Sequence, residues 1–210
     1  MVRFSEAVEQ IDAVWDMILD RQDWKDRLDV SERGVFRSFW SIAYTVPLAA
    51  TLYYLGWHIQ EKLRSVSEGA LPDSSVQGVS FNSYLSIQAL SFLGAWIAGI
   101  VLFAGLAHSL KCSQNAGLAF VSYNWAQVPL TFFQVLILAF IFISPSFSGA
   151  LFLILSVYAI STFMYWGIIR RAFNRDTGVS IAIIAMLVLV EIAITSVAGA
   201  IVSVAETLFT

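Results

Sequence analysis

The chain contains one stretch, residues 112–169, that runs for 58 residues without a charged side chain. About 20 residues cross a hydrocarbon core of about 30 Å as a helix, so this stretch is long enough to cross a bilayer twice. Charged residues are scarce in the whole chain as well, at 13% against roughly 25% in soluble domains. These features argue against a soluble globular domain and predict an integral membrane protein.

Apolar runs before and after this stretch complete a predicted membrane domain. Residues 1–33 form a charged, amphipathic segment, whereas residues 34–207 hold apolar runs that are each long enough to span a bilayer. The predicted fold class is therefore all-α, a bundle of five transmembrane helices preceded by an amphipathic helix. Asp29 and Glu32 have the spacing of a capping box before the first membrane helix, and a polar loop at 59–80 follows it. The five helices are expected at residues 34–57, 81–110, 118–143, 150–169 and 179–207.

The basic residues are distributed unequally between the two ends of these helices. Of the twelve Lys and Arg residues, only Lys62 and Arg64 lie in the loop after the first helix. The other ten lie in the N-terminal segment, at the start of the first helix (Arg37), and in the turns that follow the second and fourth helices. Because inside segments carry the excess of basic residues, the N-terminus is predicted inside and the C-terminus outside. The single cysteine, Cys112, then faces the reducing side. Compact loops and no apparent targeting segment favour a bacterial inner membrane.

The segment before the first membrane helix has the pattern of an amphipathic helix over residues 4–20. Apolar side chains such as Val14 and Ile18 recur at helical spacing, acidic side chains such as Glu9 and Asp16 occupy the other face, and Ser5 can cap the start. We expect this helix to dock on the rest of the protein. Two alternatives are a helix lying flat in the membrane interface and a helix that binds a partner.

One ionisable residue lies well inside a predicted membrane helix. Glu191 falls about 16 Å from the inner boundary, close to the middle of the bilayer. No basic side chain is expected beside it, so the less costly state is a protonated carboxyl that donates a hydrogen bond. The functional interpretation is a proton or cation site. The alternative is a structural carboxyl that is hydrogen-bonded or tilts toward an interface.

Two prolines are expected at the same depth as this carboxyl. Pro47 and Pro129 both occur in Val-Pro-Leu, and each removes a backbone donor from its helix. Interrupted helices with a carboxyl at one depth are a common construction of a transporter site at the bilayer midplane, although helix packing alone also explains prolines. The polar residues that could line such a site are Tyr44, Thr45, Asn124 and Gln127.

Small residues give two helices a face on which a neighbour can approach closely. They occur in the second membrane helix and in the outer half of the fifth. We expect these faces to be sites of helix packing, and their residues are Gly94, Ala95, Gly99, Thr195, Gly199 and Ser203.

Motifs for catalysis, metal binding or cofactor binding are not evident. His58 and His108 are expected at opposite faces of the bilayer, about 30 Å apart, so they cannot share one iron. Acidic residues between 16 and 26 lack the spacing of a calcium loop, and the basic residues sit beside apolar runs in small clusters that indicate topology. The sequence therefore predicts no catalytic residues, no metal, no cofactor and no nucleic-acid partner.

Two segments resemble a known family. The segment from Tyr123 to Pro129 (YNWAQVP), after a short turn at Lys111, is similar to the third helix of bacterial members of the Yip1 superfamily of small membrane proteins. The turn from Arg170 to Arg175 (RRAFNR) also resembles theirs, and the helix layout over residues 34–207 is similar. The resemblance implies a non-enzymatic protein that shapes membranes or scaffolds other membrane proteins.

The leading hypothesis is a non-catalytic membrane protein that organises membrane or acts as a scaffold or assembly component. Its expected partners are membrane lipids and either further copies of itself or other membrane-protein subunits. A small proton- or cation-coupled transporter that uses Glu191 is the main alternative. An accessory subunit of a larger membrane complex is the third.

Overall fold

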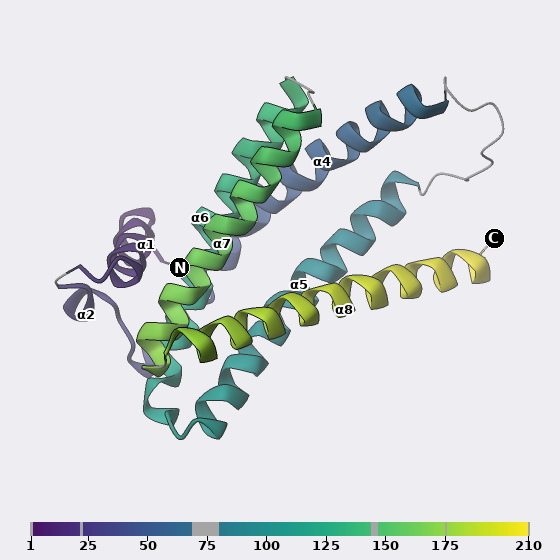
Figure 1. Ribbon diagram of the computed structural model, residues 1–210. Helices are drawn as coiled ribbons and strands as arrows, with labels where there is room; N and C mark the ends of the chain where they lie inside the picture. The colour runs from purple at the N-terminus through teal and green to yellow at the C-terminus, as the bar shows by residue number, and fades with distance from the viewer. Residues whose placement is uncertain (1, 22, 69–79, 144–146, 175, 210) are drawn as a thin grey trace.

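The computed structural model describes residues 2–21, 23–68, 80–143, 147–174 and 176–209. All regular elements in these ranges are helices, and no strand occurs among them. Eight α-helices and one 3₁₀ turn, η1, follow one another along the described chain (Figure 1). They are α1 (Phe4–Ile18), α2 (Trp24–Arg27), α3 (Glu32–Ser38), α4 (Ser41–Glu68), α5 (Phe81–Ser109), η1 (Ser113–Asn115), α6 (Ala116–Ile143), α7 (Phe147–Phe173) and α8 (Thr177–Phe209).

Four segments of the described chain are long and apolar enough to cross a membrane. They correspond to the second to fifth predicted membrane helices, and they are Phe81–Ser109, Ser113–Ile143, Leu151–Phe173 and Thr177–Val204. The first predicted membrane helix corresponds to α4, which has the length but a lower apolar density. Tyrosines, threonines and Pro47 dilute its apolar residues. The fifth span therefore stays a prediction.

The first predicted helix, 34–57, is divided and displaced in the structure. It starts as the short helix α3, is interrupted at residues 39–40, and resumes as α4, which continues to Glu68. The Ser31 side chain caps α3 by accepting a hydrogen bond from the Gly34 N–H at 3.1 Å. Asp29 instead accepts hydrogen bonds from the backbone and the hydroxyl of Ser31. The loop expected at 59–80 is thus partly helical, and residues 69–79 of it lie outside the described chain.

The remaining boundaries lie close to their predicted positions because local signals end these helices. Lys111, just after α5, has a φ of 56°, and Asn174, just after α7, has a φ of 48°. This left-handed backbone conformation is a common stop for a helix. Asp176 then caps α8, since its carboxylate accepts a hydrogen bond from the Val179 N–H at 2.9 Å. At the N-terminus, Arg3 takes the capping position that was expected at Ser5.

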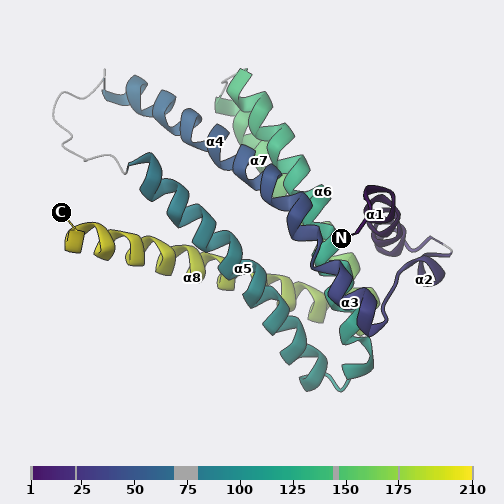
Figure 2. The same cartoon turned by 180° about the vertical axis from the view of Figure 1, so that it is seen from behind.

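The long helices form two groups that separate toward one end of the molecule. In the first group α4 packs along α6, and α6 packs along α7; in the second, α5 pairs with α8. The groups meet where η1 joins α5 to α6 and where α7 leads into α8. From there α5 and α8 diverge from the other three helices (Figures 1 and 2). Both α4 and α6 continue through their prolines, so neither helix is broken at the midplane.

Two clusters of buried apolar residues hold this arrangement together. The first fixes α1 on α6 and α7, and its largest members are Val14, Met17, Ile18, Val121, Trp125, Met164 and Ile168. The second lies where the two groups of helices meet, and it includes Phe103, Tyr123, Ile169, Phe173, Ile183 and Ile184. These clusters fill the halves of the helices next to η1 and the turn between α7 and α8, and beyond them α5 and α8 diverge from the other three long helices (Figure 1).

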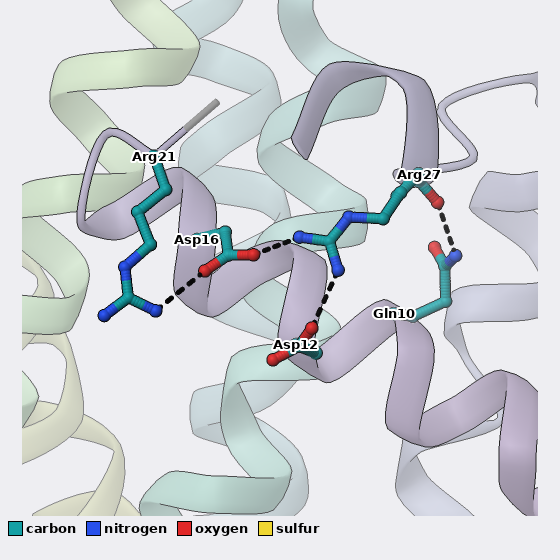
Figure 3. A network of polar contacts seen from close by, with 5 residues as sticks. All are labelled: Gln10, Asp12, Asp16, Arg21 and Arg27. Carbon is teal, nitrogen blue, oxygen red and sulfur yellow. Dashed lines mark hydrogen bonds and ion pairs between the residues drawn. The ribbon is translucent and has the colours of Figure 1, made fainter. Parts of the chain in front are cut away.

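Arginines neutralise the acidic face of α1. Arg27 donates to Asp12 at 2.7 Å and also pairs with Asp16, which accepts a second hydrogen bond from Arg21 at 3.2 Å (Figure 3). Gln10 donates to the Arg27 carbonyl oxygen at 2.8 Å. This network fastens the α2 segment onto α1, so the first of the three interpretations of the N-terminal helix, docking on its own protein, describes the structure.

Two further ion pairs tie α1 to the membrane helices. Arg171 of α7 lies 2.6 Å from the carboxylate of Asp20, just after α1. On α3, Arg37 pairs with Glu6. The backbone N–H of Arg3 and the guanidinium of Arg37 lower the pKa of Glu6 below its ordinary value of 4.5. The Glu6 carboxylate is therefore charged over the physiological range, as this pairing requires.

Candidate functional site

Asn124 is the most enclosed polar residue of the candidate site. Its amide nitrogen donates to the Ser38 hydroxyl at 2.8 Å, and its amide oxygen accepts from the Trp96 indole N–H at 3.0 Å. Ser38 in turn donates to the carbonyl of Val35 at 2.7 Å. Asn124 thus joins α3, α5 and α6 at one point. Each of its partners is a protein group, so its role in this arrangement is to hold three helices together.

Gln127 lies one turn further along α6, and its amide donates to the Tyr165 hydroxyl of α7 at 3.2 Å. The Tyr165 ring stacks on Tyr123, with ring centroids 6.1 Å apart. Tyr123 itself packs against α5 at Gly99, where an added Cβ atom would lie 2.3 Å from its hydroxyl oxygen. Gln127 therefore belongs to a polar and aromatic contact among three membrane helices, and Pro129 is half-buried beside it.

Tyr44 and Thr45 are used where α1 meets α4. The Tyr44 hydroxyl donates to the Val2 carbonyl oxygen at 3.1 Å, and its ring lies 6.3 Å from the rings of Phe4 and Trp125. Thr45 is buried and donates to the Ser41 carbonyl within α4. Pro47, in contrast, is exposed. Tyr44 therefore contributes to the docking of α1, whereas Thr45 bonds within α4 itself.

Glu191 projects from the packed face of α8. Residues spaced three or four apart along this face are buried or half-buried, and they are Ser180, Ile184, Leu187, Ile194 and Ala198. Glu191 falls within that register but is itself exposed. Within the described chain, its carboxyl makes no hydrogen bond and no ion pair.

Three tyrosines of the other helix group are buried or half-buried. They are Tyr53 of α4, Tyr123 of α6 and Tyr165 of α7, and a negative charge on Glu191 would act weakly on each of them. Gln127 thus contacts Tyr165, but within the described chain no hydrogen bond joins Glu191 to Gln127 or to the other polar residues predicted for the site. A carboxyl inside a membrane helix is itself a candidate site for a proton or a cation.

The two small-residue faces that the sequence predicts as packing sites differ in whether a neighbour covers them. An added Cβ atom at Gly94 would lie 2.8 Å from the Ile194 side chain, so this glycine permits the contact between α5 and α8. Gly99 permits the approach of Tyr123, and Ala95 between them is half-buried. On α8, Thr195 and Ser203 are exposed, and no atom lies within 4 Å of a Cβ placed at Gly199. The first face is packed within this chain and the second is not.

Comparisons of the chain with protein-family models, with curated proteins and with solved structures found no match. The resemblance to the Yip1 superfamily therefore stays a prediction.

The sequence reasoning did not connect these three tyrosines with the candidate site. Tyr53 lies near the outer end of the first predicted membrane helix, where an aromatic residue is expected at the interface. Tyr123 lies in the half of α6 next to η1, Tyr165 lies in the half of α7 that leads to α8, and neither carries a local signal of its own. One clue was available, because a buried tyrosine usually needs a hydrogen-bond partner. That requirement predicts a polar group near each buried tyrosine but does not identify the residue that supplies it.

Proposed function

We propose that this chain is a non-catalytic integral membrane protein that acts as a scaffold or assembly component for other membrane helices. One observation supports the proposal. The outer half of α8 carries a row of small residues, Thr195, Gly199 and Ser203, that no helix of the described chain covers. Small residues let helix backbones approach closely, which is a principal means of association in membranes. The partner is a second copy or another membrane protein, as in an accessory subunit.

The proposed topology has five spans, with the N-terminus inside and the C-terminus outside a bacterial inner membrane. The packing of α4 along α6 supports α4 as the fifth span, because a helix that lies along a spanning helix shares its depth. Ten of twelve basic residues then fall on the inner side, which supports the orientation. Within this topology the uncovered row on α8 lies in the outer half of the bilayer, where another membrane helix can reach it.

Replacing Gly199 by leucine tests this interface. The added side chain would occupy the space that a partner backbone needs, whereas inside the chain the first added atom would meet no neighbour. We expect Gly199→Leu to convert the assembled particle largely to monomer without unfolding it. Native mass spectrometry in a mild detergent measures this directly. Gly105→Leu is the matched control, because Gly105 on α5 is equally open but lies outside the row.

The control variant should assemble as the wild-type protein does. A strictly monomeric wild-type particle with no co-purifying protein would contradict the assembly function. Equal dissociation of both variants would show instead that leucine disturbs the bundle in general and that the row on α8 is not the interface.

A second candidate function, a small proton- or cation-coupled transporter, is favoured by the surroundings of Glu191. Glu191 is the one charged side chain of the span Thr177–Val204, which belongs to one helix group, and its charge would act on tyrosines of the other group. Helix groups that join at one end and separate toward the other can rock against each other around the joined end. A titratable group on one of them would be exposed or covered as the groups move.

The transport candidate predicts that Glu191→Gln abolishes ion flux and leaves the fold intact. Glutamine keeps the size of the side chain but cannot carry charge or release a proton. Flux would be measured in proteoliposomes with a pH-sensitive dye inside, and folding by size-exclusion chromatography. Glu9→Gln, a similar change at an exposed position of α1, should leave flux unchanged. Persisting flux in the Glu191 variant would remove Glu191 from the transport function.

A further inference from the structure

We propose that a cavity between α1, α3 and α6 binds a primary ammonium ion that also carries an oxygen acceptor, the chemistry of an ethanolamine group. The cavity has a volume of about 240 Å³ and forms where α1 and α3 both pack on α6 (Figure 2). Its lining comes from the N-terminal segment and α6, so the cavity is separate from Glu191 on α8. The polar residues of the lining are Glu6, Glu9, Gln10, Asp29, Arg37 and Trp125.

The Trp125 side chain shows that the cavity has to supply a hydrogen-bond acceptor. This residue is only 2% exposed, yet its indole N–H makes no hydrogen bond within the described chain. Of the described residues, Ser91 alone has a fully enclosed side-chain polar atom without a partner, so the Trp125 nitrogen keeps a small opening. Because Trp125 lines the cavity, we infer that its N–H opens there. A buried indole N–H normally has an acceptor, and an occupant of the cavity would provide it.

The charges of the lining favour a cation. It contains three carboxylates, on Glu6, Glu9 and Asp29, and one guanidinium. That guanidinium, on Arg37, pairs with Glu6. Glu9 and Asp29 make no ion pair within the described chain, although Asp29 accepts hydrogen bonds from Ser31. Two carboxylates are thus left without a positive charge, and an ammonium ion with three N–H donors can bind both.

One occupant has to suit both the carboxylates and the indole. A bare metal ion offers no acceptor to the Trp125 N–H, and no three His, Cys, Asp or Glu side chains of the described residues gather closely enough to hold one. An anion would satisfy that N–H but would meet the carboxylates of Glu9 and Asp29. A primary ammonium with a hydroxyl or ester oxygen meets both requirements. Its source is a free amino alcohol or the ethanolamine headgroup of a phospholipid.

Nuclear magnetic resonance of the full-length, nitrogen-15-labelled protein in detergent tests the site with ethanolamine as the probe. The indole N–H of Trp125 gives its own signal, which is assigned by its loss in Trp125→Phe. We expect ethanolamine to shift this signal. Propylamine has the same shape without the oxygen acceptor, and ethylene glycol has it without the charge. Both should bind at least about tenfold more weakly, since each lacks one charged or polar contact.

An exposed carboxylate keeps the test independent of the protein core. Glu9→Gln should weaken ethanolamine binding about tenfold, because a hydrogen bond between two charged groups is lost. Glu32→Gln is the matched control, since Glu32 is also exposed but does not line the cavity, and it should bind as wild type does. The cavity is separate from Glu191, so Glu9→Gln should weaken amine binding without changing ion flux.

Short-chain phospholipids distinguish the two sources of the ligand. Tighter binding of dihexanoylphosphatidylethanolamine than of ethanolamine would support a lipid headgroup as the occupant, and weaker or equal binding would support a free amine. Dihexanoylphosphatidylcholine has no N–H donors, and equal binding of this lipid would overturn the assignment of a primary ammonium. An unmoved Trp125 signal, equal binding of ethanolamine and propylamine, or unchanged affinity in Glu9→Gln would overturn the site and leave water as the occupant of the cavity.

Discussion

Replacing Gly167 by leucine should release α1 from the membrane helices. Gly167 is buried on α7, and a Cβ atom there would lie 2.7 Å from the Ile18 side chain and 3.1 Å from the Ile18 backbone. Backbone cannot move aside as a flexible side chain can, so α1 itself has to shift. We expect the free energy of unfolding to fall by about 3 kcal/mol, at the upper end for an overpacked site.

Tryptic digestion of the purified protein measures this release. The segment after α1 contains Lys25 and Arg27, and Arg27 is held by its pairs with α1. Cleavage there should therefore be much faster in Gly167→Leu than in wild type. Gly105→Leu makes the same substitution in open space and should leave the cleavage rate unchanged. Unaltered protection in the Gly167 variant would show that α1 is held mainly by its ion pairs.

Packing should dominate the docking of α1 because the ion pairs around it are partly exposed. The side chains of Arg21 and Asp20 are 63% and 62% exposed, and pairs of this kind contribute at most about 1 kcal/mol each. Met17 and Val14, in contrast, are almost fully buried against α6 and α7. The arginines thus neutralise the acidic face and fix its orientation, while the apolar face supplies most of the attraction.

The helices could be predicted because their signals are local. Apolar runs set the position of α5 to α8, and turn signals at Lys111 and Asp176 set their ends. The division of the first helix depended on which of two neighbouring residues caps α3. The sequence offered Asp29, and the structure uses Ser31, since Asp29 is bonded to Ser31 instead. Which of two residues so close in sequence becomes the cap depends on contacts in the folded protein, and a local sequence pattern does not contain these contacts.

The partners of the candidate site could not be predicted because they depend on how distant segments meet. The small-residue pattern predicted close approach at Gly94 and Gly99, but not that Ile194 and Tyr123 would be the neighbours. In the same way, the sequence pattern predicted only that Gln127 could line a polar site at the midplane. The identity of Tyr165 as that partner follows only from the packing of α6 on α7.

Replacing Asn124 by leucine should lower the free energy of unfolding by about 2 kcal/mol, whereas the same change at Gln134 should be neutral or stabilising. Both amides belong to α6. Asn124 is fully buried and accepts from the Trp96 indole, so leucine leaves that N–H without an acceptor. Gln134 is half-buried and makes no hydrogen bond within the described chain, so leucine only removes a polar group from an apolar region.

Unfolding by sodium dodecyl sulfate, followed by tryptophan fluorescence, compares the two variants under one condition. Because the side-chain amide, the helix and the substituted residue are shared, a difference between them measures the hydrogen bonds of Asn124 rather than the polarity of an amide. Equal stability would mean that the Trp96 N–H finds another acceptor once Asn124 is gone. In that case Asn124 would not be needed to hold α3, α5 and α6 together. Its amide would then be free to bind a ligand.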